Sequence, residues 1–240
     1  IKFEEKPELD RWIISELNTL ISKVEKFYED YEPTKAAREI SNFVIDNLSN
    51  WYVRLSRRRF WKGEYELDKI SAYQTLFTVL ADICKISAPI SPFFMDKMFQ
   101  DLTRNIDEKF SESVHLENFP VSDVCKIDKD LQEKINYAQI ISSLTLSLRA
   151  KEKIKVRQPL NRILIPVDSS GKKNIINSVS EEIKREVNVK NIEFIDGESD
   201  LLVKSIKPNF KKLGPKYGKF MKEISSKTNL LENTRICLLY

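Results

Sequence analysis

The fold is decided first by residues 9–31, which read LDRWIISELNTLISKVEKFYEDY. Their large apolar side chains recur at steps of three and four residues: Leu9, Trp12, Ile13, Leu17, Leu20, Val24, Phe27 and Tyr31. Side chains three and four residues apart share one face of an α-helix, so this spacing predicts a long helix with one apolar stripe. Other elements must cover such a stripe, which favours a bundle of helices.

The same spacing continues beyond this stretch. A short polar break ends the first pattern, and a second helix is expected over residues 37–61. Residues 68–87 carry apolar side chains on all sides, which is typical of a central, buried helix. Pro89 and Pro92 then interrupt the pattern, because proline lacks an amide donor and restricts the residue before it. A further helix, with Ser91 as its possible N-cap, is expected from Pro92 to Leu102.

The pattern changes in the second half of the chain. Residues 104–127 indicate an irregular connection, and Asp128 can cap a helix that continues to Leu148. The spacing of apolar residues then alternates between that of a strand and that of a helix. It predicts a strand over 162–167, a helix over 173–187 and a second strand over 191–195. A third strand, antiparallel to the second, is possible over 201–206, and a final helix is expected over 217–226. The predicted fold is therefore mainly α, with an antiparallel helical bundle over residues 1–150 and a small α+β subdomain over residues 151–240.

Composition excludes several classes of protein. The chain has 240 residues, 41% apolar and 32% charged, and no apolar run reaches the length of about 20 residues that a membrane span needs. The single histidine, His115, excludes sites that need a histidine pair. Three widely spaced cysteines, Cys84, Cys125 and Cys237, indicate neither a zinc ribbon nor a disulfide set, and fit the reducing cytoplasm. We expect a soluble piece of a longer protein, since the chain begins at Ile1.

Catalytic motifs were sought and are missing from the sequence. No GxGxxG, GxxxxGK, GxSxG or HExxH string occurs, so nucleotide, acyl-transfer and metallopeptidase chemistry lack their residues. His115 is expected to be an ordinary surface or packing residue. The carboxylates Glu181 and Glu182 lie on an otherwise polar helix face, where solvation explains them. We therefore predict no catalytic residue and no metal site in this chain.

The strongest functional signal is a basic and aromatic segment over residues 51–62, WYVRLSRRRFWK, which has five basic residues, four aromatic residues and no carboxylate. Helical projection places Arg54, Arg57 and Trp61 within about 60° of one another, with Arg58 at the border and Trp51 packed beneath. Guanidinium groups pair with phosphates, and aromatic or arginine planes stack on unpaired bases, which is how RNA loops are commonly bound. The alternative is that these arginines pair with carboxylates of neighbouring helices.

Two further basic clusters support a polyanionic partner, although the net charge is only +4. One comprises Arg149, Lys151, Lys153, Lys155, Arg157 and Arg162. The other lies between residues 204 and 222 and contains Lys211, Lys212 and Lys216 beside the Gly214–Gly218 turn, where free amides and lysines could hold a phosphate. A solvated lysine-rich surface is the alternative for either cluster taken alone.

Several segments resemble those of a known family. The stretch LDRWI at residues 9–13 followed by NWYVRLSRRRFW at residues 50–61 is similar to the start of the anticodon-binding helical domain of isoleucyl-tRNA synthetases. The break APISPF at residues 88–93 resembles one shared with the valyl, leucyl and methionyl enzymes. The segments VRQPL at residues 156–160 and PNFKKLGPKYG at residues 208–218 resemble sequences that follow the bundle in the isoleucine enzyme. The resemblance extends from about residue 9 to residue 222.

The resemblance implies an RNA-binding module. By it, the chain binds the anticodon stem-loop of isoleucine tRNA through Arg54, Arg57, Arg58 and Trp61, while Lys211, Lys212 and Lys216 add backbone contacts. Catalysis with ATP and Mg²⁺ would take place in a separate nucleotide-binding domain, because the two catalytic signatures of the family are absent here. Implied partners are the catalytic and editing domains of the same chain, in a cytoplasmic monomer without membrane contact. The scattered cysteines do not match the zinc site of some relatives.

Two alternatives stay open from the sequence. The chain could be the corresponding domain of a valyl enzyme, which the Arg57–Trp61 string disfavours. It could instead be a structural domain whose basic faces dock on the rest of a synthetase without RNA affinity of its own. In that case the arginines would be buried against carboxylates.

Overall fold

The computed structural model of the protein describes residues 1–61, 64–106, 110–167, 169–196, 213 and 217–223. Its mainly α architecture, with a small α+β part, confirms the predicted fold class. The chain divides into two compact units. One comprises residues 1–161 and 174–190, and the other comprises residues 162–173 and the chain from Asn191. The domain bounds 1–150 and 151–240 stay a prediction.

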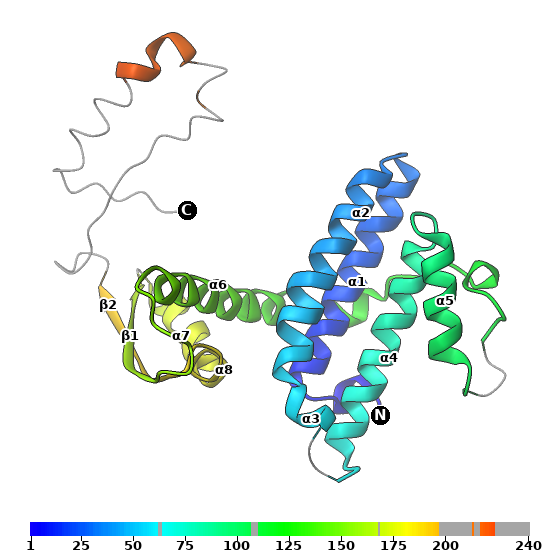
Figure 1. Ribbon diagram of the computed structural model, residues 1–240, viewed down its shortest axis with the longest axis horizontal. Helices are drawn as coiled ribbons and strands as arrows, with labels where there is room; N and C mark the ends of the chain where they lie inside the picture. Colours follow the sequence, from blue (N-terminus) through cyan, green and yellow to red (C-terminus); the bar gives the residue numbers. More distant parts are fainter. Residues whose placement is uncertain (62–63, 107–109, 168, 197–212, 214–216, 224–240) are drawn as a thin grey trace. The chain divides into compact units, whose positions relative to one another are not determined.

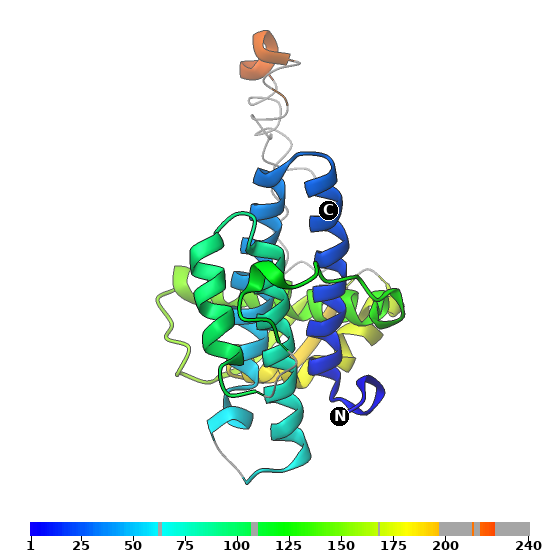
Figure 2. The same ribbon diagram turned by 90° about the vertical axis from the view of Figure 1, so that its right-hand side faces the viewer.

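Four helices form the bundle of the first unit. They are α1 (Glu8–Glu29), α2 (Pro33–Asn42), α4 (Leu67–Ser87) and α5 (Pro92–Thr103). Helices α1 and α2 run side by side in opposite directions, as do α4 and α5 (Figures 1 and 2). The predicted stripe of α1 forms the core, and Trp12, Ile13 and Val24 are at most 1% exposed. Helix α4 contacts α1, α2, α3 and α5, so it is the central helix that its all-round apolar pattern predicted.

The second predicted helix contains a segment of wider turns. After α2, residues Phe43–Val53 form a π-helix, η2, and a turn at Ser56 precedes the short helix α3 (Arg57–Trp61). The buried residues Phe43, Leu48 and Tyr52 are spaced by five and four. A π turn closes i to i+5, so this spacing brings the three side chains to one face, whereas regular α geometry would rotate them apart. The prediction of one uninterrupted α-helix was wrong at this segment.

Of the two predicted N-cap residues, Asp128 forms a side-chain capping hydrogen bond and Ser91 does not. The backbone amide of Leu131 donates to the Asp128 carboxylate at 2.9 Å, which confirms Asp128 as the cap of α6 (Lys129–Lys151). Ser91 occupies the N-cap position of α5, as expected, but its side chain makes no capping hydrogen bond. Pro92 at the first position of α5 already fixes a helical φ angle and needs no amide partner.

The connection between α5 and α6 is irregular, as predicted, apart from the 3₁₀ turns η3 (Val114–Leu116) and η4 (Val124–Lys126). Polar side chains of α1 hold its end in place. The amide of Asp123 donates to Asn18 Oδ1 at 2.7 Å, and the amide of Asp128 donates to Ser15 Oγ at 2.8 Å. Gln132 of α6 also donates to Ser15, at 2.8 Å. The start of α6 is thereby fixed against α1.

The α+β part contains two parallel strands, β1 (Leu160–Val167) and β2 (Val189–Asp196), paired in one sheet. Between them the predicted helix 173–187 is divided into α7 (Ser170–Ser178) and α8 (Ser180–Val187), with a break at the buried Val179. Asn188 ends α8 in the left-handed conformation, at φ 53°, which asparagine tolerates well. The possible strand 201–206 lies outside the described residues.

The end of the described chain begins with a 3₁₀ turn, η5 (Gly218–Phe220), and continues as helix to Glu223. The predicted helix 217–226 therefore begins at the expected place, and its remainder lies outside the described residues. Among the helices that the structure describes, none combines the length and the apolar character that a bilayer crossing requires.

Candidate nucleic-acid interface

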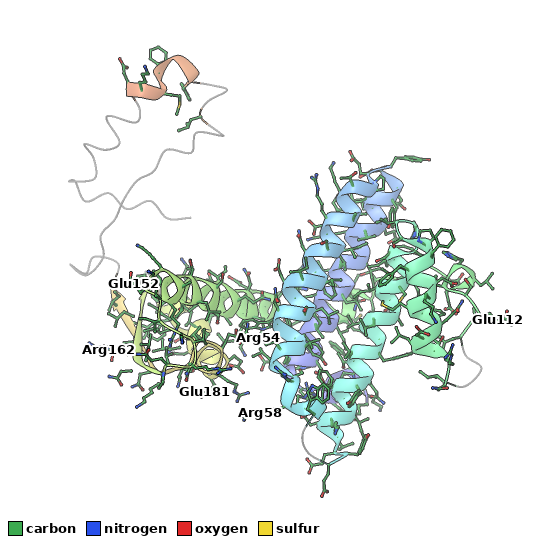
Figure 3. The ribbon with its side chains drawn as sticks, in the orientation of Figure 1. Arg54, Arg58, Glu112, Glu152, Arg162 and Glu181 are labelled. Carbon is green, nitrogen blue, oxygen red and sulfur yellow. The ribbon has the colours of Figure 1, made fainter. Side chains whose placement is uncertain are left out.

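The basic and aromatic segment lies at the junction of η2 and α3, both in the first unit. Arg54 follows η2 directly, and Arg57–Trp61 form α3 after the turn at Ser56. Ser56 is fully buried, and its amide donates to the carbonyl of Tyr52 at 2.9 Å. This contact fixes the start of α3. Figure 3 shows the side chains of this segment, with Arg54 and Arg58 labelled.

One arginine of the segment is committed to the protein interior. Arg59 donates two parallel hydrogen bonds to Asp10, at 2.7 and 2.8 Å, and also binds the carboxylate of Asp68, at 3.0 and 2.9 Å. The hydroxyls of Tyr52 and Ser71 donate to the same Asp10 carboxylate at 2.9 and 2.6 Å. Asp10 is fully buried and the Arg59 side chain is only 15% exposed. Arg59 therefore stabilises the fold and is not available to a ligand.

The charges in this network shift the pKa values of their neighbours. Burial is the largest cause that raises the pKa of Tyr52, and the negative charge of Asp10 raises it further. For Arg59, burial alone lowers the pKa, but the hydrogen bonds and charge of Asp10 outweigh burial and raise it overall. Both groups keep their protons at all physiological pH values. The network is a permanent structural element.

The neighbouring residues of α3 have a different environment. Arg57 and Arg58 are exposed, and within the described part of the chain neither makes a hydrogen bond or an ion pair. Trp61 is 81% exposed. Trp51, by contrast, is 4% exposed and packs in the core, as expected. This surface offers two free guanidinium groups beside an open aromatic plane, which suits a phosphate and an unstacked base.

The environment of Arg54 is intermediate between that of the paired Arg59 and that of the exposed Arg57. Its Nη2 lies 2.8 Å from Oε1 of Glu186 on α8, yet its side chain is 51% exposed while that of Glu186 is 7% exposed. Burial raises the pKa of Glu186, and the positive charge of Arg54 opposes this shift. Arg54 therefore compensates a buried carboxylate and still presents part of its guanidinium to solvent.

All four predicted arginine and tryptophan residues line one groove. Its volume is about 790 Å³, within the range of ligand pockets. The lining comes from three parts of the first unit: Pro7, Glu8 and Leu9; Arg54, Leu55, Arg57, Arg58, Arg59, Trp61 and Asp68; and Ile135, Val156, Val179, Glu182, Arg185 and Glu186. The structure thus brings together Arg54, Arg57, Arg58 and Trp61, as the helical projection predicted.

The groove also contains residues that the sequence did not single out. Glu182, Arg185 and Glu186 belong to α8, more than a hundred residues after α3. Glu181, predicted to be a solvated residue, is exposed and pairs with Lys184 at 2.6 Å. Glu182 was expected to be solvated like Glu181, but it is half-buried, because it lies three residues after the buried Val179 and four before the buried Glu186, at the edge of the buried face of α8. Helix α8 packs against α6.

The second basic cluster is partly structural. Arg149 is 3% exposed and donates to the backbone carbonyls of Lys155, Gln158 and Asn188, at 3.1, 2.9 and 3.0 Å. It holds the segment after α6 in place. In the second unit, Arg162 pairs with Glu193 at 3.0 Å. Lys151, Lys153, Lys155 and Arg157 are exposed.

The third basic cluster cannot be placed in the same way. Lys211, Lys212 and Lys216 lie outside the described residues. Their role in RNA binding stays a prediction.

The described residues contain no group of three or more His, Cys, Asp and Glu side chains that could hold a metal ion. Cys84 is buried, and burial raises the pKa of its thiol to about 11, so it is not a reactive thiolate.

Comparison with known proteins agrees with this geometry. Residues 10–165 match the family model described as the anticodon-binding domain of tRNA ligase. The chain therefore belongs to this family of RNA-binding domains.

The most similar sequences that we compared are isoleucine–tRNA ligases. Identity is 52% over 226 residues with the protein of Cytophaga hutchinsonii, covering 94% of this chain and 20% of that protein. The Porphyromonas gingivalis protein is 50% identical over 236 residues, which cover 98% of this chain and 20% of that protein. The Thermus thermophilus protein is 36% identical over 221 residues, which cover 92% of this chain and 21% of that protein. The chain thus spans about a fifth of the length of these relatives. The resemblance drawn from its motifs is confirmed, and the valyl alternative is not favoured.

Proposed function

We propose that this chain binds the anticodon stem-loop of isoleucine tRNA as part of an isoleucine–tRNA ligase. The observation that carries the proposal is the exposed surface of Arg57, Arg58 and Trp61 beside the groove, in a chain of the anticodon-binding family. Similarity to isoleucine–tRNA ligases along nearly the whole chain supports the choice of tRNA.

The surface has the chemistry that an RNA loop requires. Arg57 and Arg58 bind phosphates, because a guanidinium can donate two parallel hydrogen bonds to phosphate oxygens. Trp61 stacks on an unpaired base, since its ring is exposed and every base has a planar face. Arg54 adds positive charge at the edge of the groove while it remains paired with Glu186. Lys211, Lys212 and Lys216 are proposed to add contacts to the RNA backbone.

The remaining parts of the assignment rest on the relatives. We assign the joining of isoleucine to tRNA, with ATP and Mg²⁺, to a part of the protein outside this chain, so the anticodon-binding domain itself needs no cofactor. Its partners are then the tRNA and the catalytic and editing domains of the same protein. We place this protein in the cytoplasm as a monomer.

The structural docking alternative makes a different demand on the arginines. It requires guanidinium groups buried against carboxylates. Arg59 meets this requirement, but Arg57 and Arg58 have no carboxylate partner in the described chain. Docking would need carboxylates from outside this chain to reach Arg57 and Arg58, and the stem-loop titration distinguishes it from RNA binding.

Titration with anticodon stem-loops tests the proposal. Wild type and Arg57→Ala are titrated with isoleucine and valine stem-loops at two salt concentrations. We expect wild type to prefer the isoleucine loop, and Arg57→Ala to bind more weakly with a salt slope smaller by about 0.7–0.9, the loss of one phosphate contact. Arg38→Ala is the matched control, because Arg38 of α2 is exposed, lies outside the groove and has no ion pair within the described residues; it should bind like wild type. Equal, salt-insensitive binding by wild type and Arg57→Ala would contradict the proposal.

A further inference from the structure

The groove has two unlike sides. The cationic side consists of Arg57, Arg58 and Trp61 on α3, whereas α8 contributes the carboxylates Glu182 and Glu186 beside a single cation, Arg185. A site that only attracted the RNA backbone would gain nothing from carboxylates, because they repel phosphate. Their presence in the same groove therefore needs an explanation in terms of what else they can bind.

Most carboxylates that line the groove already have partners. Glu8 pairs with Lys134, and Asp68 pairs with Arg59. Glu186 pairs with Arg54. Glu182 is different: it is half-buried, and it has no hydrogen bond or ion pair within the described part of the chain. Its acceptor capacity is available to a ligand in the groove.

The surroundings of Glu182 strengthen any contact that it makes. Apolar side chains of Ile135, Val156 and Val179 line the same groove. A hydrogen bond to a charged group is stronger where water is excluded, and a carboxylate accepts only from donors. In an unstacked nucleotide the donors on the base are its amino and imino groups. A base without an amino group loses the amino contact and can offer the carboxylate at most an imino N–H.

We propose that Glu182 is a specificity-determining residue that accepts a hydrogen bond from the exocyclic amino group of an unstacked base in the groove. The phosphate of that nucleotide binds Arg57 or Arg58, and its base stacks on Trp61. Glu182 then favours guanine, adenine or cytosine, which carry an amino group, over uracil, which offers only its imino N–H, and it repels RNA that presents only phosphate. This inference rests on the proposed function, since it concerns the same site.

The test uses stem-loops in which one amino group is removed at a time. Inosine replaces guanosine, purine riboside replaces adenosine, and the 4-deoxy analogue replaces cytidine, at each loop position in turn. We expect wild type to lose about tenfold in affinity for one of these analogues, the size of a single base contact. Glu182→Ala should bind that analogue and the unmodified loop within about twofold of each other.

A second variant separates hydrogen bonding from repulsion. Glu182→Gln keeps an acceptor oxygen but removes the charge, so it should retain part of the preference while binding all loops more tightly. Glu181→Ala is the matched control: it lies next to Glu182 on α8 but is exposed, pairs with Lys184 and does not line the groove. It should keep the full preference. Urea unfolding of each variant checks that the fold is intact.

The outcomes distinguish this inference from the proposed function. If Glu182→Ala keeps the wild-type preference, or if wild type discriminates at no position, the role of Glu182 is overturned. Should Arg57→Ala still weaken binding in that case, RNA binding by the groove stands without it. If no stem-loop binds wild type, both proposals fail.

Discussion

Helix α3 carries arginines on two adjacent sides, and the arginines of the two sides lie in different environments. On one side Arg59 is enclosed by Asp10 and Asp68 and is largely buried. On the other side Arg57 and Arg58 are exposed without a partner in the described chain. The two sides differ only in what the rest of the fold brings to them. A buried guanidinium must be paired, since an unpaired one costs several kcal/mol, so the side that receives carboxylates becomes structure.

This comparison shows why a run of arginines does not by itself define a binding site. The acids that bind Arg59 lie 49 and 9 residues away along the chain. They remove one positive charge from the surface and leave its neighbours free. What matters for ligand binding is the set of guanidinium groups that the fold does not use.

We expect the largest effect on stability from a substitution on the side of α3 where Arg59 is paired with carboxylates. Asp10→Ala removes the acceptor of hydrogen bonds from Arg59, Tyr52 and Ser71 at a fully buried position. We expect a loss of about 3–5 kcal/mol in the free energy of unfolding, because buried donors are left unpaired. Urea unfolding followed by circular dichroism measures it. Asp101→Ala, at an exposed pair with Lys97, should leave the unfolding midpoint almost unchanged. Similar losses in both variants would contradict this account of the network.

A smaller effect should separate the two sides directly. Arg59→Lys keeps the charge but cannot form the paired hydrogen bonds to Asp10, so stability should fall by about 2 kcal/mol. Arg57→Lys should leave it unchanged within about 0.5 kcal/mol, because the side chain is exposed and has no partner in the described chain. Equal unfolding midpoints of the two variants would show that the sides of α3 do not differ.

The open side can be tested through its aromatic ring. Trp61→Ala should cost about 1–3 kcal/mol of RNA affinity through lost stacking, with little change in stability, since the ring is 81% exposed. Fluorescence anisotropy with a labelled stem-loop measures the affinity. Phe93→Ala on α5 removes another exposed ring, 89% exposed and outside the groove, and should not alter binding. If both variants lose affinity equally, stacking on Trp61 is not the cause.

The smallest effect concerns a partly buried acid, Asp82, which lacks the partners of Asp10. Burial raises the pKa of Asp82 above 3.8, and its nearest cation, Lys85, is 3.9 Å away. The folded state therefore holds the proton of Asp82 more tightly than the unfolded state, so stability falls as pH rises from about 3.8 through the raised pKa. Asp82→Asn removes this loss.

At pH 7 we expect Asp82→Asn to be more stable than wild type by less than about 1 kcal/mol. The difference should disappear as pH falls below the unfolded pKa of 3.8, because the acid is then protonated in both states. Asp101 is the control of opposite sign: its hydrogen bond with Lys97 lowers its pKa, so its contribution is lost as pH falls from 3.8 through the lowered pKa. Unfolding midpoints measured from about pH 2 to about pH 7 check both signs. A constant difference between wild type and Asp82→Asn would contradict the assignment.

Periodicity predicted most of the fold because it reports burial along one helix. It placed α1, α4 and α6 closely, since their stripes are long and their ends carry prolines or the cap Asp128. It failed at η2, where the apolar residues fit two helical periods over a short distance. It also missed the break at Val179, because neither proline nor glycine marks it.

The site was predictable on one side only. Arg54, Arg57, Arg58 and Trp61 are close in sequence, so a helical projection brings them together. The carboxylates of α8 reach the groove through tertiary packing, which leaves no local signal. The same holds for Arg149, whose basic surroundings indicated a surface residue, although three backbone carbonyls hold it in the interior.

The wide turns of η2 also limit how the length of this region can vary. Removing one residue between Phe43 and Val53 would advance α3 by one position, a rotation of about 100°. Phe60 would then face Asp10, and the buried carboxylate would lose its cation. Adding one residue would instead bring Arg58 to the place of Arg59, and the cation would be kept. The consecutive arginines thus keep a cation beside Asp10 after an insertion here, but not after a deletion.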